Sequence, residues 1–366
     1  MKFFFLILAS TFSYSEGSED VFSHPGLMHN LDELEFVRKK LSTGEQPWES
    51  AWNKLKSSKW ASLAYTPKPF YNVFRGNDGI EIIGASEMSD DSTAAYTHAL
   101  QYCITGNRLN ADKAIEILNA WSYTLESVSG HDARLLIGMD GVKFCNAAEL
   151  IRHSDAKWIT EDQLKFERML RKVFYPIIMD FYPTANGNWD ASMIQTMIAM
   201  GIFLDDRGMF YRAVDYFIGG DGNGAIDKYI NYFGECQESG RDQLHVQMGL
   251  GFLGCACEMA WKQGIDLYSA TNYRLLLGFE YTAKYNLGVD VPFEPYTSVE
   301  KRYHYKNIST KGRGIFRPIY ERIVNHYRYR KGIDMPYCQK VLKEMQPEGN
   351  HVQHMPWGTL FIKRSL

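Results

Sequence analysis

The segment from Gly234 to His245, GECQESGRDQLH, holds the densest group of side chains that could do chemistry. It directly precedes the apolar run Val246–Leu253, which contains no proline and predicts a buried helix beginning near Asp242. The polar cluster therefore lies at the open N-terminal end of a core helix. Its members are Gln237, Glu238, Arg241, Asp242, Gln243 and His245.

Arg241 and His245 are four residues apart, so on a helix they would share one face. Free backbone N–H groups and the helix dipole would add to their charge, and together these groups suit an anion. Gln237 and Glu238 are further candidates for contact with a substrate. The alternative interpretation is a capped helix whose polar network is only structural.

A second candidate site is the segment ANGNWDASM, in which a long apolar helix begins at about Trp189. Asn188 is at or beside the N-cap position, and capping is the simplest role for its side chain. If its amide points into a cleft instead, it offers a donor to a substrate carboxylate, with Trp189 beside it as an aromatic platform for a sugar.

The third feature is a basic segment from Lys301 to Lys331, in a chain whose overall net charge is only −3. It contains ten Lys or Arg and one acidic residue, Glu321, which gives a local net charge of +9. Five tyrosines, including Tyr303 and Tyr305, are interleaved with these cations. A solvated basic face is one interpretation. Nucleic acid is not the expected partner, because no recognition motif accompanies the segment.

The first fifteen residues have the form of a signal peptide. Met1-Lys2 precedes the apolar run Phe3–Ala9, and Ser13-Tyr14-Ser15 supplies a small-x-small cleavage signal. We therefore expect residues 1–15 to be removed and the protein to be periplasmic or secreted. No stretch reaches the roughly 20 apolar residues that a membrane span requires, and no cysteine follows the apolar run to carry a lipid anchor.

Six cysteines in 366 residues are too few and too scattered for a disulfide scaffold, and most occur in helical apolar contexts. His351 and His354 have a spacing that metal ligands can have, but no partner is evident near them. The sequence suggests no metal and no other cofactor.

Helical periodicity recurs along the chain, strand alternation is scarce and no low-complexity linker divides it. The predicted class is all-α, with residues 16–366 forming one domain of antiparallel helical hairpins closed into an incomplete barrel, an (α/α) toroid. The helices are expected at about 32–41, 48–55, 93–104, 111–125, 141–153, 161–181, 189–204, 208–217, 242–263, 268–285, 317–330 and 337–345.

Seven motifs along the chain carry a resemblance to a known family. They are HPGLMHNLDELEFVRKKL, PWESAW, DDSTAAYTHALQYCITGN, ADKAIEILNAWSYTL, GNWDASM, GECQESGRDQLHVQMGL and YHYKNISTKGRGIFRPIYERIVNHY. With these motifs the chain resembles the bacterial alginate-lyase superfamily of (α/α) toroid polysaccharide lyases, in the branch with glucuronan and alginate lyases. The resemblance covers nearly the whole chain after residue 15; the early motifs mark the fold, and the middle motifs are more specific.

The resemblance implies cleavage of an anionic uronate polysaccharide, alginate or glucuronan, by β-elimination. It implies that Asn188 and His245 contact the substrate carboxylate, and that a tyrosine carries the proton. Tyr303 is the first choice for this tyrosine and Tyr305 the rival, since both belong to the stretch RYHY. Polymannuronate is the first-choice substrate.

The chemistry explains these residue types. Elimination removes the weakly acidic proton at C5, so donors must stabilise the charge that develops on the carboxylate. Arg241 is the best candidate for an arginine donor, with Arg302 and Arg313 as alternates. A tyrosine, with an ordinary pKa of about 10, would act as base only if cations lower its pKa, and the basic segment is expected to do so.

Two other functions remain open from the sequence. An (α/α) glycoside hydrolase needs two carboxylates about 5–10 Å apart, and Glu238 and Asp242 are the only tempting pair in the middle motif. A non-catalytic sugar-binding protein would keep Trp189 and the basic segment but would not need Tyr303.

Overall fold

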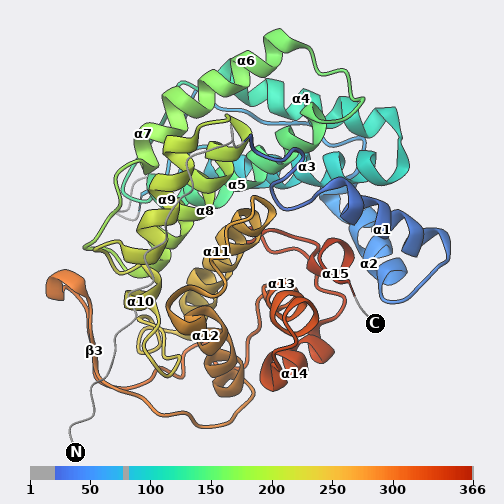
Figure 1. The fold of residues 1–366 in the computed structure, drawn as a ribbon. Coiled ribbons are helices and arrows are strands. Elements are labelled where there is room, and N and C mark those ends of the chain that lie inside the picture. Colours follow the sequence, from blue (N-terminus) through green and yellow to red (C-terminus); the bar gives the residue numbers. More distant parts are fainter. Residues whose placement is uncertain (1–20, 77–81, 365–366) are drawn as a thin grey trace, which may run out of the picture.

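The computed structural model describes residues 21–76 and 82–364, so the expected signal peptide lies outside the described residues. Four long helices form the centre of the fold, and Figure 1 shows α5 and α8 in the middle of the molecule. They are α3 (Ala85–Thr105), α5 (Ala133–Arg152), α8 (Gly187–Phe203) and α11 (Gln243–Lys262). Nearly all residues of α5, α8 and α11 are buried, so these helices form the core of the molecule.

The central helices run parallel to one another. Gly138 of α5 packs on Ser192 of α8, where a Cβ on the glycine would lie 2.2 Å from the serine Oγ. Near the other ends of the same helices, Arg152 donates to the carbonyl of Phe203 over 3.1 Å. The N-terminal ends of α5 and α8 are therefore at one end of the toroid and their C-terminal ends at the other.

Outer helices return the chain between the central ones, and Figure 1 shows α4 and α6 along the upper edge. These are α4 (Arg108–Thr124), α6 (Thr160–Met169), α7 (Tyr175–Ile178), α9 (Arg207–Gly219) and α12 (Ala270–Asn286). The remaining helices are α1 (Leu31–Ser42), α2 (Trp48–Lys56), α10 (Ile226–Tyr229), α13 (Tyr320–Val324), α14 (Pro336–Met345) and α15 (Gly358–Phe361).

The described strands are very short and form two pairs. The first pair is parallel, β1 (Asn72–Phe74) with β2 (Ser127–Ser129), and it lies beside the start of α5. The second is an antiparallel pair, β3 (Tyr296–Thr297) with β4 (His304–Tyr305), in the register Tyr296 to Tyr305. This β3–β4 hairpin carries the two candidate tyrosines.

The predicted all-α toroid is confirmed, and most predicted helix limits agree with the structure to within a few residues. The clear errors are the starts of α3 and α5, which begin eight residues before the predicted positions 93 and 141. The missed first turns of α5, residues 133–139, are largely apolar, so polar residues do not explain that error. The first turns of α3 do contain polar residues that mask the apolar period, and these residues have partners inside the fold. Ser89 donates to Asp140 over 2.7 Å, for example, and Asp140 pairs with Lys143 at 2.7 Å.

The helix predicted at 161–181 is interrupted by a π-helical turn, Leu170–Phe174, before α7. Pro176 in the first turn of α7 has no N–H to donate back to that turn, and a break there accommodates it. Likewise, the helix predicted at 317–330 begins at Tyr320 and changes to a π-helical turn at Asn325–Arg330.

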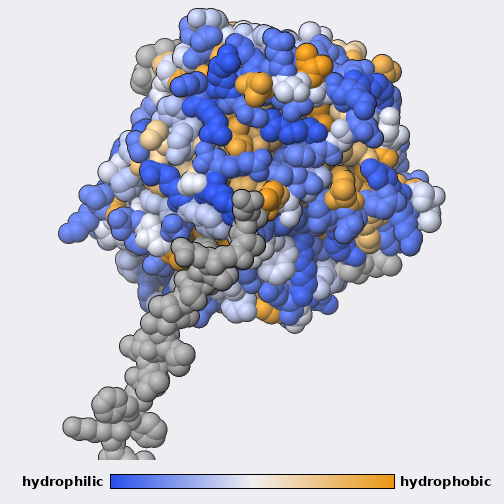
Figure 2. All heavy atoms as spheres, turned by 45° about the horizontal axis from the view of Figure 1, so that its top comes forward, coloured by the Kyte–Doolittle hydropathy of each residue, from blue (hydrophilic) through white to orange (hydrophobic). Residues whose placement is uncertain are grey.

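The six cysteines are all free and buried, as predicted. On the face shown in Figure 2, hydrophobic side chains appear as small scattered patches among hydrophilic ones. Among the described residues, no helix has the length and apolar character needed to cross a membrane.

Candidate active site

The first turn of α8 meets α11 at Asn188, whose side chain is completely buried. Its amide nitrogen donates to the sulfur of Met248 over 3.3 Å, and its carbonyl oxygen has no hydrogen-bond partner within the described residues. An unpaired buried carbonyl costs about 1–3 kcal/mol. Such groups are rare in native proteins and call for an explanation, of which a functional role is one.

The helix cap of α8 is Asn186, not Asn188, so the capping role considered for Asn188 is wrong. The Asn186 side chain makes no bond to its own helix. Its oxygen accepts from the Gln237 amide over 2.9 Å and from the Tyr305 hydroxyl over 3.2 Å. Gln237 in turn accepts from the N–H of Gly187 over 2.9 Å. Two predicted site residues from distant segments, Gln237 and Tyr305, are thus joined through Asn186.

Glu238 lies beneath this network and is fully buried. One carboxylate oxygen accepts from the Arg241 guanidinium over 2.7 Å, and the other from the backbone N–H of Asn188 over 3.2 Å and the Tyr229 hydroxyl over 3.1 Å. Burial raises the pKa of Glu238, and the Arg241 charge opposes that rise. Its hydrogen bonds within the described residues are all internal, and they hold Arg241 and the start of α8 in place.

Arg241 precedes α11 rather than lying on it, so the prediction that it shares a helical face with His245 is wrong. The helix cap is Asp242, and Arg241 is bent back onto Glu238 by the preceding turn, in which its own N–H bonds to the Glu238 carbonyl over 2.8 Å. Its side chain is 30% exposed, and one guanidinium nitrogen is bonded to Glu238. The rest of the guanidinium has no hydrogen-bond partner in the part of the chain that the structure describes.

Asp242 caps α11 and also holds the ring of His245. Its Oδ1 accepts from the N–H groups of Leu244 and His245 over 3.1 and 2.8 Å, and its Oδ2 contacts the His245 Nδ1 at 2.7 Å. Burial alone would raise the pKa of Asp242, but the bonds to the His245 ring and amide lower it to about 2. A carboxylate bound at Nδ1 fixes the ring orientation. The other ring nitrogen, Nε2, has no partner within the described residues.

The β3–β4 hairpin packs against this turn through Tyr305. A Cβ on Gly240 would lie 2.3 Å from the Tyr305 Cβ, so only glycine permits this approach. Burial raises the pKa of Tyr305 to about 12, and the Glu238 charge acts in the same direction while Arg241 opposes it. The prediction that cations lower the tyrosine pKa is therefore wrong for Tyr305, because burial and Glu238 outweigh Arg241.

Tyr303 lies two residues earlier on the same hairpin. Its ring is nearly parallel to that of Tyr305, with 6.4 Å between the ring centroids and 10° between the planes. The Arg302 guanidinium lies over the Tyr303 ring, 5.4 Å from its centroid. The backbone of Tyr303 is fixed by two hydrogen bonds to Ser298. The Tyr303 hydroxyl, unlike that of Tyr305, has no hydrogen-bond partner in the described chain and is available to a substrate.

Trp189 lies half-buried at the start of α8 in an aromatic group that the sequence did not reveal. Its ring contacts His131 and Tyr182 edge to face, with centroid distances of 5.2 and 5.5 Å. Arg134 lies over the Tyr182 ring at 5.0 Å. His131 and Arg134 come from the start of α5, so these aromatic and cationic groups gather at the same end of the toroid as the polar cluster.

Arg313 does not join the site. It donates to the carbonyl of Tyr285 over 2.9 Å and lies over that ring at 3.9 Å, at the C-terminal end of α12. Arg317, which was not singled out from the basic segment, is closer to the cluster. It is half-buried, hydrogen-bonded to His351 and electrostatically coupled to Asp242. His351 is thus an arginine partner here rather than half of a metal pair with His354.

A cavity of about 340 Å³ opens between the first turns of α3 and α5, at the same end of the toroid as the polar cluster. It is lined by Arg75, Ile82, Ala85, Ser86, Ser89, Asp90, Leu136, Met139, Val352 and Gln353.

The candidate active site contains no metal-ligand group among the described residues. The one group of three or more His, Cys or carboxylate side chains close enough to hold a metal lies at the C-terminal end of α5.

Solved structures with the same fold include alginate lyases. Alginate lyase A1-III from Sphingomonas species A1 is 14% identical, with a TM-score of 0.64, 94% of this chain covered and 100% of that chain. An alginate lyase from Bacteroides ovatus is 12% identical, with a TM-score of 0.64 and the same coverage. A histidine-to-alanine variant of A1-III, complexed with tetrasaccharide, gives a TM-score of 0.65 at 14% identity over 93% of this chain and 98% of that chain. The architecture is therefore that of the helical toroid lyases.

The sequence identifies the family more directly. The family model described as alginate lyase matches residues 79–291, which is more than half of the chain. The protein belongs to the alginate lyase family and is a polysaccharide lyase. The match includes the segments of Asn188 and His245 and ends before the β3–β4 hairpin. A comparison with curated proteins found no match.

Proposed function

We propose that this enzyme cleaves 1,4-linked uronate polymers by β-elimination and leaves unsaturated uronate ends, with polymannuronate blocks of alginate as its preferred substrate. The observation that carries the proposal is the Asp242-bound His245, whose free Nε2 lies at the start of α11 beside the Arg241–Glu238 pair. An oriented imidazole, a partly free guanidinium and a helix start form a binding site for a carboxylate.

The first chemical requirement is to stabilise the substrate carboxylate while the C5 proton leaves. His245 and Arg241 supply two donors, and the second N–H of the Asn188 amide, beside the one bonded to Met248, supplies a third. The N-terminal ends of α8 and α11 add positive potential. Because Glu238 holds Arg241 and also accepts from the Asn188 backbone, these donors are fixed before substrate binds.

The second requirement is a proton carrier, and we assign it to Tyr303. Its hydroxyl is free within the described residues, whereas the Tyr305 hydroxyl donates to Asn186 and has a pKa of about 12. In mannuronate and glucuronate the C5 proton and the C4 oxygen leave from the same face. One tyrosine then takes the C5 proton and returns a proton to the departing C4 oxygen. Tyr305 positions the hairpin against Gly240 and Asn186.

Guluronate imposes a different geometry, because its C5 proton and C4 oxygen lie on opposite faces of the ring. Cleavage there needs a base across the ring from the acid, and His245 as base with Tyr303 as acid fits that requirement. The hydrolase alternative loses its support, since Glu238 and Asp242 both have internal partners and the chain is a lyase by family.

The test is ultraviolet absorbance of unsaturated uronate ends, measured on polymannuronate, polyguluronate, alginate and glucuronan. We expect the highest rate on polymannuronate. A higher rate on glucuronan would reassign the substrate and keep the mechanism, whereas no absorbance change on any of the four would refute the proposal.

Tyr303→Phe should abolish turnover while the fold and polymer binding persist, and Tyr305→Phe is the matched control. We expect Tyr305→Phe to retain measurable turnover with a lower thermal midpoint, because it loses one bond to Asn186. The reverse pattern, an active Tyr303→Phe and an inactive Tyr305→Phe, would transfer the proton-carrier role to Tyr305.

A further inference from the structure

A second group of chemically active side chains lies at the opposite end of the toroid. His24 precedes α1, Glu149 and His153 are at the C-terminal end of α5, and one ligand atom from each lies within 4.8 Å of the others. From Asn188 to the C-terminal end of α8 at Phe203 is about 20 Å at 1.5 Å per residue. The group is therefore remote from the candidate active site.

Glu149 is the centre of this group, and its side chain is 1% exposed. Its Oε1 accepts from the His24 Nδ1 over 2.8 Å and from the N–H of Gly26 over 2.9 Å. Its Oε2 is buried and has no hydrogen-bond partner within the described residues. The nearest cationic candidate for that oxygen is the His153 Nε2 at 3.7 Å, which is too long for a hydrogen bond.

The two histidines flank this carboxylate. Their rings stack with 4.4 Å between centroids and 10° between planes. The second nitrogen of His24, Nε2, contacts the Asp205 carboxylate at 3.2 Å, from the turn between α8 and α9. A carboxylate on the far nitrogen of a histidine is the usual support of a metal-bound imidazole.

We propose that His24, Glu149 and His153 bind a Zn²⁺ ion, with Asp205 orienting His24. Two imidazoles and one carboxylate are a donor set that zinc accepts, with a water molecule as fourth ligand. The ion would pair the orphan oxygen of Glu149. It would also tie the segment before α1 to the C-terminal end of α5 and to the α8–α9 turn, which makes it a structural clasp.

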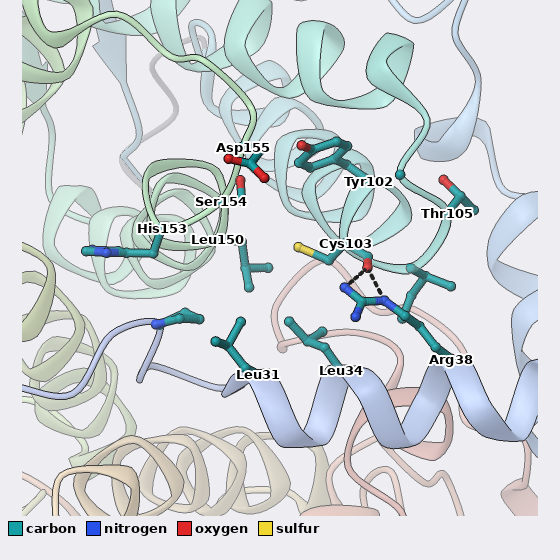
Figure 3. A pocket seen from close by; sticks show the side chains of 13 residues that line it. Leu31, Leu34, Arg38, Tyr102, Cys103, Thr105, Leu150, His153, Ser154 and Asp155 are labelled. Carbon is teal, nitrogen blue, oxygen red and sulfur yellow. Dashed lines mark hydrogen bonds between the residues drawn. The ribbon is translucent and has the colours of Figure 1, made fainter.

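Water can reach this position from a neighbouring cavity of about 520 Å³ between α1, α3 and α5. His153 lies on its wall, and Figure 3 shows Leu31 and Leu34 projecting from α1 toward Leu150 on α5. On the opposite side of the cavity, Arg38 is occupied by two hydrogen bonds to the Cys103 carbonyl. Of the three proposed ligands, His153 therefore has access to solvent through this cavity.

The first measurement is calorimetric titration of the metal-stripped protein with Zn²⁺, with Mg²⁺ as a comparison. We expect zinc to bind at micromolar concentration or below and magnesium to give no signal. His153→Gln should weaken zinc binding by at least about 100-fold, and Asp205→Asn by about 10–100-fold, as for a supporting carboxylate.

The matched control is His131→Gln. His131 also contacts one carboxylate, Asp132 at 2.8 Å, but it has no second histidine, so this variant should bind zinc as the parent does. Zinc should also raise the thermal midpoint of the parent by a few degrees and leave that of His153→Gln unchanged. No zinc binding below about 100 µM, or equal affinity in the parent and His153→Gln, would overturn the proposal.

Discussion

Replacing Asp242 by Asn removes one negative charge beneath His245 while keeping an oxygen that can cap α11. In the parent protein Asp242 accepts from two backbone N–H groups and contacts the His245 Nδ1. The asparagine oxygen can serve the two amides, since Asn and Asp are equally good caps. The ring nitrogen then faces a neutral amide, so the charge that oriented and polarised the imidazole is lost.

The size of the effect follows from the pKa of Asp242, which lies at about 2 instead of the ordinary 3.8. Each pH unit corresponds to about 1.4 kcal/mol, so the surroundings favour the charged carboxylate by about 2–3 kcal/mol. If the transition state uses all of this interaction, kcat falls by about 30- to 100-fold. Substrate binding should change less, because the lost charge acts on His245 and does not contact the polymer.

The same carboxylate predicts an acid dependence of stability. A pKa lowered in the folded state stabilises the protein above the unfolded value near 4, and this stability is lost as pH falls through about 2. The parent should therefore lose about 2–3 kcal/mol of unfolding free energy between about pH 5 and pH 1 from this group, and Asp242→Asn should lack that component.

The assays are initial rates of absorbance increase on polymannuronate, and urea unfolding at several pH values. Asp206→Asn is the matched control, because Asp206 also caps a helix, α9, and pairs with Arg171 at 2.7 Å far from His245. That variant should keep the parent kcat. A parent-like kcat in Asp242→Asn, or an equal loss in Asp206→Asn, would refute the assigned role of Asp242.

Three further outcomes test the site. Exhaustive chelation should leave turnover intact, because no metal ligand group lies near His245 in the described chain, and complete loss restored by one divalent ion would contradict this. His245→Ala should slow polymannuronate cleavage by about 10²–10³-fold. If His245 is also the base for guluronate bonds, polyguluronate cleavage should slow by a further ~10²–10⁴-fold. Equal losses on both polymers would show that His245 only contacts the carboxylate. Gly240→Ala should lower the unfolding free energy by about 1–3 kcal/mol and reduce turnover, because the new Cβ would overlap Tyr305. If the variant were as stable in urea as the parent, the β3–β4 hairpin would have to shift freely.

Helical periodicity and capping preferences located the helices correctly where apolar residues were continuous in the sequence. The Val246–Leu253 run predicted α11, and Asp242 is the cap at its start, as a short polar side chain before an apolar run should be. The same rules placed the starts of α3 and α5 too late. In α3 the polar residues of the first turns are bonded to other elements, as Ser89 is to Asp140, and periodicity in one segment does not reveal such partners.

The candidate site was predictable in composition and only partly in geometry. Sequence spacing placed Arg241 on a helical face with His245, but the chain turns sharply before Asp242 and Arg241 pairs with Glu238 instead. The role of Asn186 gave no local signal, because its partners Gln237 and Tyr305 are 51 and 119 residues away. A dense polar segment showed which residues matter, while their contacts required the toroid.

The parallel packing of the central helices gives the toroid an electrostatic polarity. Helix N-terminal ends favour anions and C-terminal ends favour cations. The N-terminal ends of α8 and α11 carry Asn188 and His245, which suits a substrate with one carboxylate per sugar. The C-terminal end of α5 carries Glu149 and His153, which suits the proposed zinc ion. Because the two groups are at opposite ends, zinc should change the thermal midpoint without changing the rate, whereas Asp242→Asn should mainly change the rate.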